Sequence, residues 1–182
     1  MKIRTYLTHT LLLLFALAMM SACKSNKPIE MNTSQIVKNL DLQRYAGKWY
    51  EIARMPFFQE KDMMNTTATY KIRPDGKIKV TNEGYKFSKD GKHKKATAVA
   101  WIPDPAIMGQ LKVRFFWPFT GDYHIVALDT ENYSYAMVKS GGLLWILARE
   151  PQLDNSIYNS LVEKANSLGI ETEKLIKVEQ DW

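Results

Sequence analysis

The most reactive side chain in this sequence is a single thiol near the N-terminus. Cys23 is the only cysteine among the 182 residues, so no internal disulfide can form. It directly follows Ser21 and Ala22, two small residues of the kind found at signal-peptide cleavage sites. Because no disulfide can form, the fold of an exported chain must rest on its hydrophobic core alone.

The residues before this cysteine have the pattern of an export signal. Lys2 and Arg4 provide a positive start, and an uncharged apolar run follows at residues 11–20. The run is shorter than the roughly 20 apolar residues of a membrane-spanning helix, which favours cleavage over retention. We therefore predict a signal peptide at residues 1–22 and a mature chain that begins at Cys23.

The segment from Met20 to Cys23 resembles a bacterial lipobox, with Met20 where leucine is usual. The resemblance implies that Cys23 becomes an S-diacylglycerol cysteine with an N-palmitoyl chain, and two or more acyl chains anchor a protein stably. Lys24 is not the aspartate that retains lipoproteins at the inner membrane, so we expect attachment to the cell outer membrane, facing the periplasm. The alternative is an incidental thiol beside an ordinary cleavage site.

The mature sequence lacks the residue patterns of a catalytic or metal-binding protein. Only His93 and His124 remain after cleavage, and no His or Cys pair has the spacing of metal ligands. The sequence contains neither a Gly-x-Ser-x-Gly motif nor a phosphate-binding loop. We predict no enzymatic activity, no metal and no cofactor, with a lipid-modifying enzyme as a less favoured alternative.

The positive charge of the chain is scattered along the sequence. The formal net charge is +6, and the densest basic group is Lys92-His93-Lys94-Lys95, which follows Asp90-Gly91. A turn dipeptide between strand-like runs favours a solvated hairpin tip here over contact with anionic lipid headgroups. No recognition motif accompanies the charge, so we predict that the protein does not bind nucleic acid.

Short β-rich runs separated by turn signals make up most of the chain. Residues 23–39 are polar and predict a lipidated, flexible tether, whereas residues 40–182 predict one folded domain. Turn signals such as Asp75-Gly76 and Gly141-Gly142 join successive runs, which predicts an antiparallel up-and-down meander. The eight expected strands are 47–55, 66–73, 77–85, 95–102, 111–117, 122–128, 133–139 and 142–149.

Eight such strands favour an all-β barrel wide enough to hold one small ligand. A helix is expected after the last strand, because Asp154 can cap it and Ile157, Leu161 and Ala165 follow at helical spacing. Gly169 is placed to end this helix. We expect the helix to pack outside the barrel, since several strands are apolar on both faces.

Three segments, in order along these strands, resemble the signatures of the lipocalin family. Gly47-Lys48-Trp49 begins the first strand like the Gly-x-Trp signature, and Arg149 closes the eighth strand as in the third signature. The second signature falls at 129–133, where Glu131-Asn132-Tyr133 replaces Thr-Asp-Tyr. The segment 113–123 also resembles the bacterial outer-membrane lipocalins and their apolipoprotein D-like relatives.

The resemblance implies an eight-stranded up-and-down antiparallel lipocalin barrel with one C-terminal α-helix packed outside. It implies a structural role for Gly47, Trp49 and Arg149, with the guanidinium packed over the indole at the closed end. It also implies a fatty acid or lysophospholipid ligand, bound for lipid storage or transport in envelope maintenance. The alternative is a structural or interaction lipoprotein with a filled barrel, and the sequence leaves a homodimer open.

The residues that line the barrel are predicted from the alternation of side chains along each strand. Trp145 has the same parity as Arg149, and His124 and Met137 on adjacent strands are expected to point inward with it. Small residues such as Ala68 and Ala100 favour an open interior. We therefore take Trp145, His124 and Met137 as the candidate ligand contacts.

Overall fold

The computed structural model describes residues 31–182, so the predicted export signal and Cys23 lie outside the described residues. The strands are β1 (Gly47–Arg54), β2 (Met63–Ile72), β3 (Ile78–Lys86), β4 (His93–Trp101), β5 (Gln110–Phe116), β6 (Phe119–Leu128), β7 (Tyr135–Ser140), β8 (Leu143–Ala148) and β9 (Ile176–Lys177). The helical segments are η2 (Thr33–Gln35), α2 (Leu42–Tyr45), η3 (Phe58–Glu60), α3 (Asn155–Ser167) and η4 (Thr172–Lys174).

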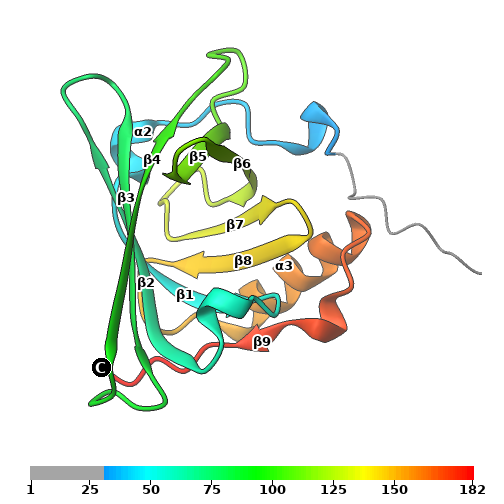
Figure 1. Ribbon diagram of the computed structural model, residues 1–182. Helices are drawn as coiled ribbons and strands as arrows, with labels where there is room; N and C mark the ends of the chain where they lie inside the picture. The colour runs from blue at the N-terminus through cyan, green and yellow to red at the C-terminus, as the bar shows by residue number, and fades with distance from the viewer. Residues whose placement is uncertain (1–30) are drawn as a thin grey trace, which may run out of the picture.

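Strands β1 to β8 close into an antiparallel barrel (Figure 1). Neighbours follow chain order from β2 to β8, and β1 completes the ring by pairing with both β8 and β2. The short β9 is added beside β1 at Ala53 and Arg54, past the residues of β1 that pair with β2. The predicted fold class, an eight-stranded up-and-down barrel, is confirmed, and β9 is a short strand beyond those eight.

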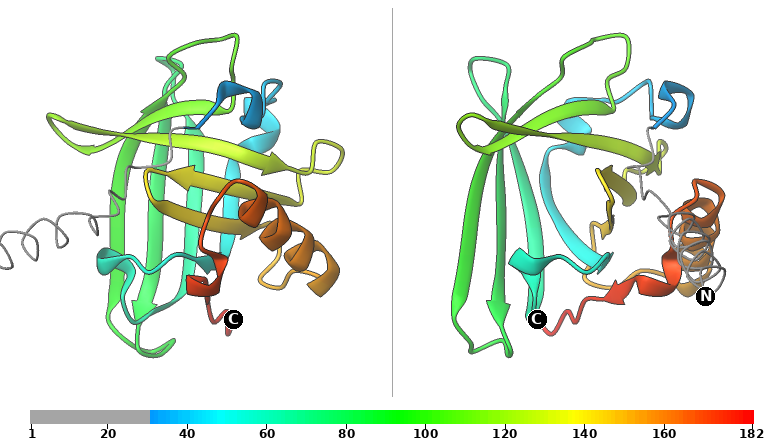
Figure 2. Two further views of the ribbon diagram at one scale, coloured as in Figure 1. Left: turned by 90° about the vertical axis from the view of Figure 1, so that its right-hand side faces the viewer. Right: turned by 45° about the vertical axis from the view of Figure 1, so that its right-hand side comes forward.

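Helix α3 packs against the outside of the barrel (Figure 2). Asp154 caps it by accepting a hydrogen bond from the amide of Ser156, and Gly169 follows its end with a φ of 77°. Leu161 and Ala165 are buried against apolar side chains of β6, β7 and β8. These strands are therefore apolar on both faces because one face lines the barrel interior and the other packs under the helix.

Residues 31–39 pack against the barrel, which corrects the prediction of a flexible tether throughout 23–39. Ile36 and Leu40 are buried, and the amide of Val37 donates a hydrogen bond to the carbonyl of Ile125. The carbonyl of Val37 in turn accepts a hydrogen bond from the amide of Gly109. A few apolar side chains within a polar stretch are enough to dock it, because their burial is favourable and its backbone groups find partners.

One end of the barrel is closed by Trp49 and Arg149. Trp49 is fully buried, and its indole N–H donates a hydrogen bond to the carbonyl of Tyr45 at 2.8 Å. The guanidinium of Arg149 lies 3.8 Å from the centroid of the Trp49 ring and donates to the carbonyls of Lys48 and Ala46 at 2.8 and 3.0 Å. This arrangement, which the resemblance implies, ties β8 to β1 and to the end of α2.

Gly47 allows the arginine to approach the start of β1 this closely. Its φ is 99°, a left-handed value that side chains with a Cβ rarely adopt. A Cβ atom at this position would also lie only 3.2 Å from Nη1 of Arg149. Both the backbone conformation and the crowding therefore favour glycine as the first residue of the Gly-x-Trp segment.

The loop between β6 and β7 is ordered although its sequence departs from the second signature. Oδ1 of Asp129 accepts hydrogen bonds from the amides of Glu131 and Asn132 at 3.2 and 3.1 Å. The hydroxyl of Tyr133 accepts a hydrogen bond from the amide of Asp41 at 2.9 Å. The loop is thereby joined to the cap of α2 at the closed end of the barrel.

We expect Arg149→Lys to destabilise the domain by about 2–4 kcal/mol, because lysine lacks the planar fork that bonds several carbonyls and stacks on the indole. Urea unfolding followed by circular dichroism measures the loss. The matched control is Arg114→Lys, whose guanidinium lies 5.6 Å from the centroid of Trp101. This control should change the free energy of unfolding by less than about 0.5 kcal/mol. Equal losses in the two variants would contradict the special role of Arg149.

Candidate functional site

A cavity of about 400 Å³ occupies the barrel interior. This volume lies within the range of about 300–1,000 Å³ that is usual for small-molecule sites. All eight barrel strands contribute to its wall, together with the segment that joins β1 to β2. Much of the wall is aliphatic, with contributions from Val80, Leu111, Val113, Val138, Leu143 and Leu147.

Small side chains leave part of the barrel interior unfilled. Ala68 on β2 and Ala100 on β4 both line the cavity, at positions where a larger apolar residue would occupy it. Ala98, two residues before Ala100, is buried in the apolar core inside the barrel. Because the barrel has room for a ligand only where its inward side chains are small or spaced apart, these alanines help to create the cavity.

The cavity opens at the end of the barrel opposite Trp49. Since successive strands are antiparallel, the β1–β2, β3–β4, β5–β6 and β7–β8 connections all lie at this open end. The cavity is lined by Phe57, in the first of these connections, and by Phe116 and Phe119, on either side of the third. The mouth is therefore bordered by aromatic rings.

A chain of tyrosine hydroxyls lies toward the closed end. The hydroxyl of Tyr123 is 2.7 Å from the hydroxyls of both Tyr45 and Tyr70. Burial is the main cause that raises the pKa of Tyr70 to about 12, so its hydroxyl remains protonated at neutral pH. Tyr45 also contacts Trp49, with the ring centroids 5.0 Å apart. This part of the interior is polar but carries no charge.

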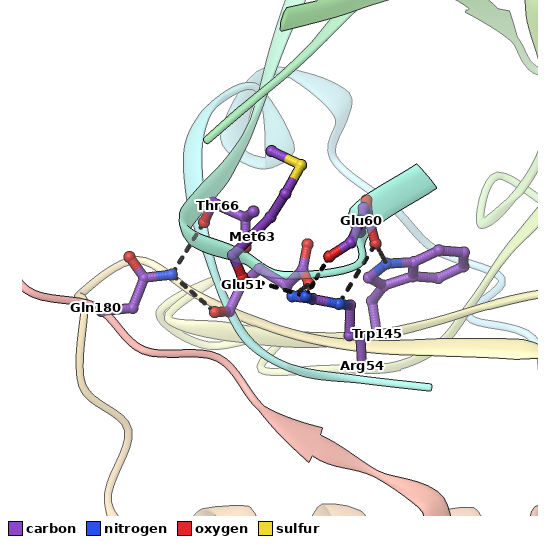
Figure 3. Close-up of polar contacts among 7 residues, drawn as sticks. All are labelled: Glu51, Arg54, Glu60, Met63, Thr66, Trp145 and Gln180. Atoms are coloured by element: carbon purple, nitrogen blue, oxygen red, sulfur yellow. Dashed lines mark hydrogen bonds and ion pairs between the residues drawn. The ribbon is translucent and has the colours of Figure 1, made fainter. Parts of the chain in front are cut away.

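An arginine and two glutamates form a buried ionic cluster in the wall (Figure 3). Nη1 of Arg54 donates to Oε1 of Glu51 at 2.9 Å, and Nε of Arg54 lies 3.9 Å from Oε2 of Glu60. The indole N–H of Trp145 donates to the same Oε2 of Glu60 at 3.1 Å. Nη2 of Arg54 donates to the backbone carbonyls of Glu60 and Met63. Glu51, Glu60 and Trp145 all line the cavity.

The electrostatics of this cluster favour a neutral carboxyl group. Burial, together with the nearby charge of Glu60, raises the pKa of Glu51 to about 8, against the opposite effect of Arg54. Burial also raises the pKa of Glu60, against the effects of Trp145 and Arg54. One guanidinium thus faces two carboxyl groups that share it, and burial raises the pKa of both carboxyl groups.

The structure separates the three candidate ligand contacts. Trp145 lines the cavity, whereas Met137 points to the opposite face of β7 and packs with Leu161 under α3. The expectation that Met137 faces inward is wrong because Val138, its neighbour, is the residue that pairs with Trp145. A side chain one position away lies on the other face of the sheet.

The expectation for His124 is wrong for the same reason. Its neighbour Tyr123 lines the cavity, so His124 lies on the outer face of β6, where it pairs with Lys139. Burial lowers the pKa of His124, and its Nε2 atom is enclosed without a hydrogen-bond partner in the part of the chain that the structure describes. The side chain of His124 therefore faces away from the cavity.

We did not predict Glu51, Arg54 and Glu60 from the sequence as residues of the site. One signal was available, because Glu51 has the same parity on β1 as the inward-facing Trp49. A charged residue at an inward position of a barrel strand is uncommon and points to a site. Glu60 gave no such signal, because it lies in η3, outside any strand.

Two further features concern metals and membranes. Within residues 31–182, no group of three or more His, Cys, Asp or Glu side chains is arranged to hold a metal ion. No helix in the same range is both long and apolar enough to span a bilayer.

The barrel, its closed end and its cavity define a lipocalin, and sequence comparison agrees with this class. Residues 40–180 match the family model described as a lipocalin-like domain. The chain therefore belongs to the lipocalin family.

Relatives from several kinds of organism match most of the chain. It is 40% identical over 146 residues to the outer membrane lipoprotein Blc of Vibrio cholerae, covering 79% of this chain and 85% of the relative. It is 38% identical to temperature-induced lipocalin-1 of Arabidopsis thaliana, covering 83% and 85%. It is 31% identical to apolipoprotein D of Macaca fascicularis, covering 94% and 95%.

Solved structures share the fold at lower sequence identity. Insecticyanin from the tobacco hornworm Manduca sexta aligns with a TM-score of 0.63 at 21% identity, covering 79% of this chain and 82% of that chain. Apocrustacyanin C1 aligns with a TM-score of 0.68 at 15% identity, covering 86% and 89%. These similarities support the barrel architecture alone.

We expect the free energy of unfolding of the domain to decrease as the pH rises from about 5 to about 8, because of Glu51. Its pKa is raised from 4.5 to about 8 on folding, so the folded state binds more protons than the unfolded state in this range. The contribution is fully present below the unfolded pKa and is lost as the pH rises through the folded pKa. Urea unfolding at several pH values measures the slope.

The variant Glu51→Gln should flatten this slope, since glutamine does not titrate. Glu83→Gln is the matched control, because its hydrogen bond with Lys95 lowers the pKa of Glu83 and moves its contribution below this pH range. A Glu51→Gln variant that keeps the slope of the unmodified chain would show that Glu51 is not the cause of the pH dependence.

Proposed function

We propose that this lipocalin binds a fatty acid or a lysophospholipid in its barrel, for lipid storage or transport in maintenance of the cell envelope. The observation that carries the proposal is the cavity of about 400 Å³, which is open at one end and mostly apolar in its wall. The same cavity argues against the alternative of a structural lipoprotein with a filled barrel. Trp145 is the proposed ligand contact, because its ring is part of the wall.

A free-energy estimate supports this class of ligand. Burial of about 14 methylenes at roughly 0.8 kcal/mol each gives on the order of 11 kcal/mol. Association and ordering of the ligand cost at least about 4 kcal/mol. The remaining 7 kcal/mol, approximately, corresponds to micromolar affinity without any covalent step.

We expect Ala68→Phe to weaken ligand binding at least about tenfold, because the new ring would occupy the cavity next to this wall position. The measurement is a titration of residues 24–182, which include every residue that the structure describes, with a lysophospholipid and with a fatty acid. Tryptophan fluorescence provides the signal, and the variant Trp145→Phe shows how much of the change comes from Trp145.

The control for this titration is Thr97→Phe, which adds the same ring at an exposed position of β4. Saturable binding that Ala68→Phe abolishes and Thr97→Phe preserves would support a ligand inside the barrel. If the unmodified domain is free of co-purified lipid and gives no saturable response, the filled-barrel alternative replaces the proposal.

We also propose that acylated Cys23 anchors the chain to the outer membrane, facing the periplasm. The lipobox resemblance and the relatives named outer membrane lipoproteins support this location. The anchor would leave only a short segment before residue 31, where the packed part of the chain begins. The barrel would therefore lie close to the membrane surface.

We expect the unmodified protein to fractionate with outer membranes and Cys23→Ala to lose this attachment, because alanine cannot form the thioether. Immunodetection in separated membrane and soluble fractions measures the distribution. Lys24→Ala, one residue away, is the control and should remain with the membranes. Recovery of the unmodified protein in the soluble fraction would refute the anchor.

A further inference from the structure

The open end of the barrel displays five large aromatic side chains to solvent. Phe58 is 87% exposed, Trp117 is 81% exposed and Phe87 is 77% exposed, while Phe116 and Phe119 are each 67% exposed. We call these five residues the aromatic rim. Soluble domains seldom gather so many exposed aromatic rings at one end, and such groupings mark interaction surfaces.

The aromatic rim lies at the end of the barrel where the cavity opens. Phe116 and Phe119 line the cavity, and their ring centroids are 5.5 Å apart. Phe58 directly follows Phe57, another lining residue. The amide of Phe87 donates a hydrogen bond to the carbonyl of Asp62 at 2.9 Å, which joins the β3–β4 hairpin to the β1–β2 connection. Rings at or beside three separate connections therefore lie at the open end of the barrel.

Phe87 is held in a backbone conformation that bulky residues rarely adopt. Its φ is 66°, in the left-handed region that favours glycine or asparagine. The ring is also largely exposed, so burial within the domain does not compensate for this conformation. An exposed aromatic residue in a strained conformation at a hairpin tip points to a contact outside the barrel.

Basic side chains accompany the rim on the same hairpin. Lys89, Lys92 and Lys94 are exposed, and Nζ of Lys86 lies 5.5 Å from the centroid of the Phe87 ring. Only one acidic residue, Asp90, lies between Lys86 and Lys94. Aromatic rings beside exposed lysines are the combination that interfacial membrane-binding segments use.

We propose that the aromatic rim docks on the surface of an anionic lipid bilayer. The rings lie at the level of the headgroups, and the lysines of the β3–β4 hairpin contact anionic lipids. In this orientation the mouth of the cavity faces the membrane, so a lipid ligand passes between bilayer and barrel without crossing bulk water.

The charge of the rim favours a bilayer over a second copy of the chain. Two copies that meet symmetrically through this end would bring their β3–β4 lysines toward each other, and like charges oppose such an interface. An anionic membrane offers the opposite charge together with an apolar layer for the rings. The inference goes beyond ligand binding, because docking through the rim requires neither a bound ligand nor the lipid anchor.

The docking is tested with residues 24–182, which lack Cys23 and therefore any acyl anchor. Co-sedimentation compares vesicles that contain phosphatidylglycerol and phosphatidylcholine with vesicles of phosphatidylcholine alone. We expect binding to the anionic vesicles that exceeds binding to the neutral ones. The double variant Phe58→Ser with Trp117→Ser should reduce it at least about tenfold, because both side chains are exposed and add apolar area to the membrane contact.

Matched variants separate the rim from general effects of charge and hydrophobicity. Lys92→Gln with Lys94→Gln should weaken binding by about fivefold per lysine. Lys71→Gln with Lys79→Gln removes the same charge from exposed positions of β2 and β3 and should change binding little. Ile176→Ser removes an exposed apolar side chain from β9 and should also have little effect.

Three results would overturn the proposal. These are absence of binding to the anionic vesicles, equal binding to both kinds of vesicle, and equal losses in the rim variants and their controls. Sedimentation velocity without lipid tests whether a second copy of the chain binds to the rim instead. A dimer that the rim variants dissociate would show that the rim is a dimer interface and would overturn docking on a bilayer. The ligand titration proposed above is performed without vesicles, so a failure of docking is distinguishable from a failure of ligand binding.

Discussion

The double pairing of β1 is the constraint on which the rest of the structure depends. Residues 47–50 of β1 pair with β2, and residues 50–54 pair with β8, so this one strand closes the sheet. A register shift between Glu51 and Ala53 accompanies the change of partner. Closure removes the free edges that an open eight-stranded sheet would present, and it encloses the space in which a ligand can lie.

The two ends of this closed sheet are built for different tasks. At one end Trp49, Tyr45 and Arg149 fill the interior and bond the neighbouring backbone, which fixes the strands there. At the other end three of the connections carry exposed aromatic residues, and the interior remains open. The packed end thus holds the strands in place while the other end leaves the cavity open, so the binding site is built on rigid elements.

The Glu51–Arg54–Glu60 cluster lies in the wall between these ends. Burial of two carboxyl groups beside one guanidinium is costly, and a well-packed apolar group of similar size is often as stable. The indole N–H of Trp145 shares Glu60 with Arg54, so the cluster connects an ionic group to an aromatic ring of the cavity. Because Glu51, Glu60 and Trp145 line the cavity, the cluster places polar groups in an otherwise mostly apolar wall.

The sequence by itself determined the eight strands, the C-terminal helix and the three family signatures, because alternation, turn residues and caps are local patterns. The tertiary structure decided which faces look inward. Register shifts, such as the one between Ile125 and Ala127 in β6, change the parity of a strand without any mark in its sequence. The pairing between strands also sets the faces: Trp145 pairs with Val138 and His124 pairs with Lys139, so Trp145 lines the cavity while Met137 and His124 do not. Residues 36–39 dock on the barrel although the sequence around them is polar. The ionic cluster likewise required the fold, since Glu60 meets Arg54 and Trp145 only when β1, η3 and β8 come together.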